Sequence, residues 1–119
     1  MRRHLYLVFT NAVEGRDDEL NDWYTARHFV DMLGLDGFEA AQRFRVDGEV
    51  PELPFRYLVI YEVPEDRLEQ AKESLRENAR ERAAALEAGR EPRIPVSPHV
   101  ANMRSFWVTA TTDRFEAEG

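Results

Sequence analysis

Residues 55–63 read FRYLVIYEV, and this stretch decides the fold because a strand formed here would be apolar on both of its faces. One face would carry Phe55, Tyr57, Val59 and Tyr61, and the other would carry Leu58 and Ile60. A strand that is apolar on both sides needs cover on both sides. The stretch therefore predicts an interior strand of a sheet that lies between two layers of structure.

The flanking segments give the element order β-α-β-β-α-β. Period-two patterns predict strands over 4–10, 38–46, 55–63 and 101–112, and period-3.6 patterns predict helices over 16–33 and 64–89. The proline-rich residues 91–99 are expected to form an ordered loop. This order is that of the ferredoxin-like split motif, an α+β fold with a four-stranded antiparallel sheet and two helices on one face. We predict a single domain over 1–112 and a C-terminal tail over 113–119.

Two helices on one face leave the other face of the sheet uncovered. Strands two, three and four carry apolar or aromatic side chains on both registers, so the bare face would expose more apolar surface than monomers usually tolerate. A second copy of the chain is the simplest cover. We therefore expect a homodimer in which two sheets pair.

The composition narrows the classes of function. Of the 119 residues 43% are hydrophobic and 33% are charged, which is typical of a globular chain. The net charge of −7 argues against nucleic-acid binding, and no segment is apolar enough for a membrane span. The chain has no cysteine, and its amino terminus does not read as a signal peptide, so we expect a cytoplasmic protein.

The first predicted helix concentrates versatile side chains in the run NDWYTARHFVDM, residues 21–32. At about 100° per residue, Leu20, Trp23, Tyr24, Arg27 and His28 fall on one side, which should face the sheet. Leu20 and Trp23 are explained by packing alone. Tyr24 and His28 lie four residues apart, and they either satisfy each other in the core or line a cavity. In a cavity His28 could move a proton, Tyr24 could donate to an oxyanion, and Trp23 and Arg27 would contact the substrate.

Four further residues are weaker candidates for substrate binding. Asn11 ends the first strand where such a cavity would open, although it also suits a turn, and Gln42 and Tyr57 lie on registers that could face the helices. Trp107 is the fourth. The histidines at positions 4, 28 and 99 are too scattered for a metal site, and we predict neither a metal nor a cofactor.

The run from Asn11 to Val46 resembles the EthD-like branch of the dimeric α/β-barrel superfamily. The matching positions are Gly15, Leu20, Asn21, Trp23, Tyr24 and His28 in the helix, then Gly37, Phe38, Ala41, Arg43 and Phe44 in the strand. Such sequences often carry proline two residues after the histidine, where this chain has Val30, which puts a bend of the helix at His28 in doubt. The resemblance implies two ferredoxin-like subunits joined into a barrel, with a cleft between helix and sheet.

The superfamily carries out varied small-molecule chemistry, and the fold does not select among its reactions. The nearest analogy is a cyclase without a cofactor, so we expect isomerisation, cyclisation or dehydration of an aromatic or polyketide-like substrate. One alternative is a non-enzymatic ligand-binding or accessory protein, and another is a cofactor-free oxygenase. The superfamily also includes enzymes that handle heme. If this chain bound heme, His28 or His99 would have to be the axial ligand.

Overall fold

The computed structural model describes residues 2–118 and contains one antiparallel sheet of four strands. The strands are β1 (Arg3–Ala12), β2 (Ala40–Arg45), β3 (Tyr57–Pro64) and β4 (Val100–Thr109), in the spatial order β2-β3-β1-β4. β3 therefore lies inside the sheet, as its two apolar faces predict. The order and the antiparallel pairing confirm the predicted ferredoxin-like α+β fold.

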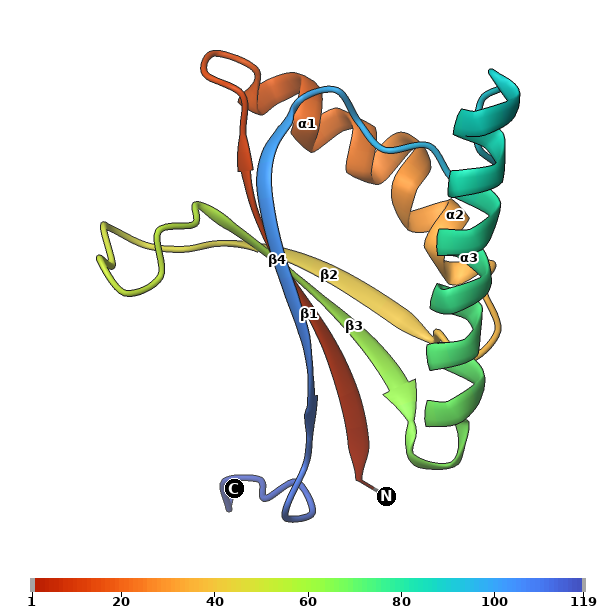
Figure 1. The fold of residues 1–119 in the computed structure, drawn as a ribbon. Coiled ribbons are helices and arrows are strands. Elements are labelled where there is room, and N and C mark those ends of the chain that lie inside the picture. Colours follow the sequence, from red (N-terminus) through yellow and green to blue (C-terminus); the bar gives the residue numbers. More distant parts are fainter. Residues whose placement is uncertain (1, 119) are drawn as a thin grey trace.

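Both helical segments cover the same face of the sheet (Figure 1). The first is continuous from α1 (Asp17–Trp23) through the π-helical turn η1 (Tyr24–His28) to α2 (Phe29–Leu33). The second is α3 (Leu68–Ala88), preceded by the 3-10 turn η2 (Glu65–Arg67). On the far side of the sheet, the β2–β3 loop projects away from the helices (Figure 1).

The strand register shows which side chains meet the helices. Tyr6 pairs with Tyr61, and Val8 pairs with Val59, so these side chains share one face. Val59 and Tyr61 are 0% and 1% exposed, because the helices lie directly over them. On the same face Leu20 of α1 is fully buried. The hydrophobic core thus lies between the sheet and the two helical segments.

β2 departs from the predicted alternation. The strand begins at Ala40, and Phe38 before it packs against Tyr6, Tyr61 and Trp107 from outside the strand. Arg43 pairs with Val59 and so faces the helices, whereas Gln42 pairs with Ile60 and faces the opposite side. The prediction that Gln42 could face the helices is wrong, because a one-residue offset moves every side chain of a strand to the other face.

At most of the helix and strand ends, the observed boundary lies one to three residues from the predicted one. Pro64 ends β3 instead of opening the helix, and Gly89, which adopts the left-handed conformation, ends α3 as predicted. Within α3, Ala85 is buried, while its neighbour Leu86 is 69% exposed. In the predicted tail, residues 113–118 form no helix or strand, and residue 119 lies outside the described residues.

No helix within residues 2–118 is long and apolar enough to cross a membrane. The same part of the chain contains no group of three or more histidine, cysteine, aspartate or glutamate side chains arranged to hold a metal ion.

Candidate functional site

The π-helical turn η1 brings Trp23 and His28 together. In a regular α-helix these residues would point about 140° apart, but a π-turn aligns residues five apart. The two rings stack with centroids 4.3 Å apart and an interplanar angle of 18°. The ring centroids of Tyr24 and Phe29, which are also five residues apart, lie 5.5 Å from each other. The turn therefore builds an aromatic cluster that the α-helical wheel does not produce, and π-turns of this kind are frequent at functional sites.

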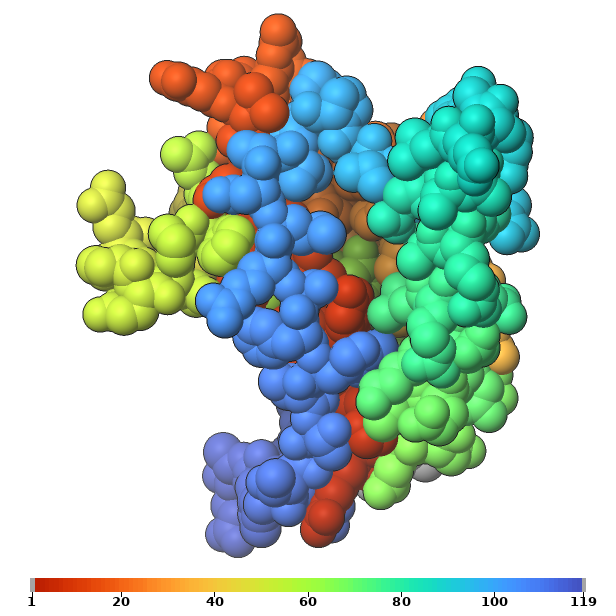
Figure 2. All heavy atoms as spheres, in the orientation of Figure 1, coloured from red at the N-terminus to blue at the C-terminus, as the bar shows by residue number. Residues whose placement is uncertain are grey.

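Three rings of this cluster, those of Trp23, Tyr24 and His28, line a cavity of about 160 Å³ between the helices and the sheet. The mouth lies between α3 and β4, where Figure 2 shows a hollow with deeper atoms visible in it. Most of the wall is aromatic or aliphatic, and its polar groups include the hydroxyls of three tyrosines together with three other side chains: Tyr6, Tyr24, Tyr61, His28, Asn78 and Arg82. An apolar hollow with a few convergent polar groups is the usual form of a small-molecule site.

His28 is held as a neutral imidazole. Burial lowers its pKa to about 4, and the positive charge of Arg82 acts in the same direction, while Asp31 opposes both. Its Nδ1 atom is buried and has no hydrogen-bond partner. The histidine is therefore not the satisfied core residue that would have been the simplest structural explanation. It keeps an unused polar atom beside an apolar cavity.

Tyr24 is the second titratable group of the cavity wall and is 3% exposed. Burial raises the pKa of its hydroxyl, while Arg43 and the Thr10 hydroxyl oppose that shift. Thr10 Oγ1 is itself buried and has no partner within ordinary hydrogen-bond geometry. The shift keeps Tyr24 protonated at neutral pH, so it can donate a hydrogen bond but is not a base.

Arg43 lies between two tyrosine rings. Its guanidinium carbon is 4.5 Å from the centroid of Tyr24 and 4.1 Å from that of Tyr57, and it donates a hydrogen bond to Asn21 Oδ1. Arg43 Nε and Nη2 are buried without a partner. The guanidinium thus fixes Tyr24 from behind by cation–π contact. The expectation that Gln42 could face the helices would place Arg43 on the opposite side of β2, so this role was not predicted.

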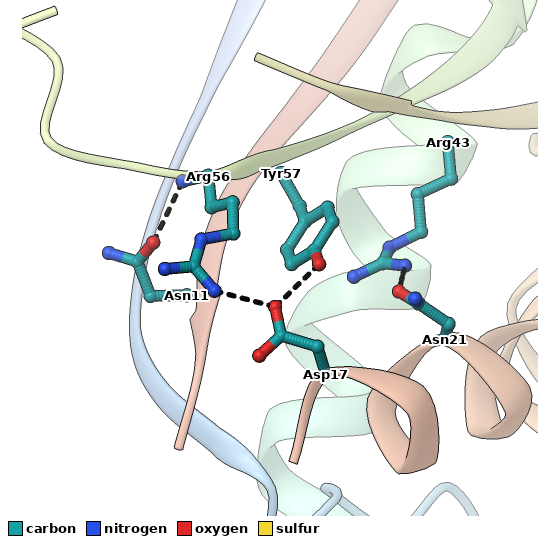
Figure 3. Close-up of polar contacts among 6 residues, drawn as sticks. All are labelled: Asn11, Asp17, Asn21, Arg43, Arg56 and Tyr57. Carbon is teal, nitrogen blue, oxygen red and sulfur yellow. Dashed lines mark hydrogen bonds and ion pairs between the residues drawn. The ribbon is translucent and has the colours of Figure 1, made fainter. Parts of the chain in front are cut away.

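A polar network borders Arg43 at the start of α1 (Figure 3). Tyr57 and Arg56 donate to the same oxygen, Asp17 Oδ2, over 2.6 and 2.7 Å, and the two bonds lower the pKa of that carboxyl. Asn11 accepts from the Arg56 backbone N–H over 2.7 Å and donates to the Pro54 carbonyl over 2.8 Å. These contacts tie the β2–β3 loop to β1 and α1.

The structure separates the predicted site residues. His28, Tyr24 and Trp23 line the cavity, and Tyr57 lies behind it, against Arg43. The remaining four predicted residues do not line it: Asn11, Arg27, Gln42 and Trp107.

Two of these four have other partners that explain their positions. Arg27 is exposed and pairs with Asp31 and Glu91, because the π-turn rotates it away from the sheet. Trp107 packs on Tyr6 at 4.8 Å, inside the helix-facing core. The prediction that Arg27 faces the sheet is therefore wrong. It assumed a regular α-helix, and the same π-turn that brings Trp23 and His28 together changes the direction of Arg27.

A wider hollow of about 430 Å³ lies elsewhere, lined by Asn11 and residues 48–56 of the β2–β3 loop. Its wall includes Glu49, Arg56 and several prolines but no histidine or tyrosine. We take the smaller helix–sheet cavity as the candidate site, because it gathers a histidine and two tyrosines whose pKa values are shifted mainly by burial: His28, Tyr24 and Tyr61.

Fold and site together define a ferredoxin-like α+β protein with an apolar, histidine-lined cavity between helices and sheet. No family model and no curated protein matches the sequence significantly. Among solved structures, the heme degrader MhuD from Mycobacterium tuberculosis, with two hemes bound in its active site, is similar with a TM-score of 0.59 and 19% identity, over 94% of this chain and 99% of that one. An EthD family protein from Bacillus halodurans has a TM-score of 0.49 and 14% identity, over 91% and 97%. The likeness to MhuD shows that the single chain has the ferredoxin-like subunit fold, and it shows the fold alone.

Proposed function

We propose that the protein binds a small, ring-containing apolar molecule in the helix–sheet cavity and catalyses proton transfer on it without a cofactor. His28 would remove a proton from carbon, and Tyr24 would donate to the enolate oxygen that develops. The observation that carries the proposal is the buried His28 imidazole, neutral and with Nδ1 unpartnered, in the wall of an apolar cavity. Isomerisation next to a carbonyl, aldol-type cyclisation and loss of water from a β-hydroxy carbonyl compound can each begin with such a step.

The volume of the cavity sets the size of the ligand. A dry apolar cavity of about 150 Å³ is known to accept benzene, and this cavity measures about 160 Å³. It therefore suits one aromatic ring with a short substituent. A polyketide-like substrate with several rings would extend through the mouth between α3 and β4.

A heme does not fit the cavity. Sites for drug-sized ligands measure about 300–1,000 Å³, and a tetrapyrrole is no smaller than such ligands. His99, the other histidine considered as an axial ligand, does not line the cavity. We derive no step that involves heme.

A second candidate function is ligand binding without catalysis. The low pKa that keeps His28 neutral also makes it a weak base, since general bases work best with a pKa near the operating pH. A carrier or accessory protein would use the same apolar cavity without needing His28 to accept a proton.

Hydrogen–deuterium exchange into acetophenone separates these two functions. Acetophenone is a single ring with exchangeable protons next to a carbonyl, and exchange requires removal of a C–H proton and return of a deuteron from solvent. We expect the protein to accelerate exchange and His28→Leu to lower the rate by about 10²–10⁴-fold. The rate should fall below about pH 4, where His28 becomes charged, and not near its ordinary value.

NMR of the methyl signal in deuterated buffer gives the rate, and the same titration gives the affinity. Arg80→Gln, a change on α3 outside the cavity, should keep both. Acetophenone binding without accelerated exchange would contradict the enzyme and favour the carrier.

The protein is also expected to form a homodimer through the bare sheet face. Phe44 and Phe106 on that face are both 40% exposed, and their cross-strand partners on β3 and β1, Leu58 and Leu7, are apolar. Light scattering should give about twice 13.9 kDa, and Phe106→Glu should give the monomer. Phe115→Glu, in the 90% exposed tail position, should leave the dimer intact. A wild-type monomer at micromolar concentration would contradict this pairing.

A further inference from the structure

We propose that the ligand of the helix–sheet cavity carries an anionic oxygen group, such as a carboxylate or an enolate, and that Arg82 binds it. This inference rests on the proposed function and adds the chemical class of the ligand. It also assigns to α3 a specificity-determining residue that the sequence pattern did not single out.

The charge of the cavity wall is opposite to that of the whole protein. The chain has 23 acidic and 16 basic residues, yet none of the residues that line the cavity is acidic. Arg82 is the single lysine or arginine among them. A low-dielectric hollow with one positive charge and no negative one attracts an anion.

Arg82 has no internal counter-ion. Within residues 2–118 it forms no ion pair, whereas Arg76 and Arg80 on the same helix both pair with Glu73, over 2.9 and 2.8 Å. The adjacent Glu81 pairs with Arg90 over 3.1 Å and with Arg93 over 3.7 Å. The nearby carboxylates are therefore engaged by other arginines.

The guanidinium of Arg82 is also incompletely hydrogen-bonded. Its Nε atom is buried and has no partner. A buried donor left unpaired costs about 1–3 kcal/mol, and an anionic oxygen of a ligand would satisfy it. Arginine binds carboxylates through two parallel N–H donors, and Nε–H is one of those that take part.

Arg82 and His28 lie in the wall of the same cavity, so one bound molecule could contact both. Both line the cavity, and the charge of Arg82 reaches the imidazole, since it lowers the pKa of His28. An anionic group held by Arg82 would place the attached ring or carbon chain beside His28. Asn78, one turn earlier on α3, adds a neutral amide to the same wall.

Benzoate and acetophenone test the inference, because they have nearly the same shape and differ in charge at about pH 7. Calorimetric titration gives the ratio of their affinities for each variant. We expect Arg82→Gln to lower the benzoate-to-acetophenone affinity ratio by about 10-fold or more, the value of a charge-assisted hydrogen bond. Arg80→Gln removes the same charge outside the cavity and should leave the ratio unchanged.

Arg82→Lys keeps the charge but not the two parallel donors, so its benzoate-to-acetophenone affinity ratio should lie between those of the wild type and Arg82→Gln. This second variant also keeps the test valid if Arg82→Gln does not fold. An unchanged ratio in Arg82→Gln, or acetophenone binding without any benzoate binding, would overturn the inference while the proposed function stands. If neither probe binds the wild type, the proposed function fails and the inference fails with it.

Discussion

Acidification from pH 6.5 to pH 4 is expected to lower the free energy of unfolding of the wild-type protein by about 3 kcal/mol more than that of His28→Leu. In the folded protein His28 has a pKa of about 4, while in the unfolded chain it titrates near 6.5. Between these values the unfolded state binds a proton that the folded state does not. Stability from this group is complete above the unfolded pKa and is lost as the pH falls to the folded pKa.

Urea unfolding of both proteins at several pH values measures the difference. The comparison cancels the carboxylates that titrate in the same range, because both proteins contain them. The charges that act on His28 are Asp31 and Arg82, and both stay in place in His28→Leu. Met32→Leu keeps the histidine, so its free energy of unfolding should depend on pH as that of the wild type does. Parallel curves for wild type and His28→Leu would show that the imidazole is not buried as described.

Gly37→Ala is expected to destabilise the protein by about 3 kcal/mol or more. Gly37 has φ +96°, and a Cβ placed there would lie 2.7–2.8 Å from the backbone nitrogen, Cα and Cβ of Ala71. Ala71 is fully buried in α3, so the helix itself would have to move. Because α3 also carries Leu75, Asn78 and Arg82 of the cavity wall, the change should weaken ligand binding as well.

Gly48→Ala is the matched control. Gly48 also has positive φ, +70°, but a Cβ there meets nothing within 4 Å. Its cost should be confined to the backbone conformation, about 1–2 kcal/mol. If urea unfolding gives equal losses for the two variants, close packing of α3 against the segment before β2 is not what holds the helix.

The sequence predicted the fold well for a physical reason. Residues 55–63 are apolar on both faces, and few arrangements other than an interior strand bury both. Helix ends at Gly34 and Gly89 were also readable. The boundary at Pro64, between β3 and the helix that follows, was harder to predict, since a proline suits the end of a strand and the start of a helix almost equally.

The candidate site was only half predictable. Trp23, Tyr24 and His28 stood out because three polar or aromatic rings within six residues are unusual on a core-facing helix. The π-turn was not readable, and it moves Arg27 out to solvent while bringing His28 onto Trp23.

Two arginines of the site were also missed. Arg43 was missed because Phe38 looks like the first residue of β2 but precedes it, which inverts the assigned faces. Arg82 falls near the apolar stripe of the second predicted helix, but the charges of that helix were taken as a solvated face, so its place in the cavity wall was not predicted.

The central claim is that a one-ring molecule binds beside His28. Its most direct test is the NMR signal of the His28 ring Cε1–H, assigned by its loss in His28→Leu, during titration with acetophenone. The claim predicts a saturable shift of that signal in the wild type, and its loss in Val100→Phe, which fills the cavity from the wall at the start of β4. A His28 signal that stays unmoved in the folded wild-type protein up to the solubility limit of acetophenone would contradict it.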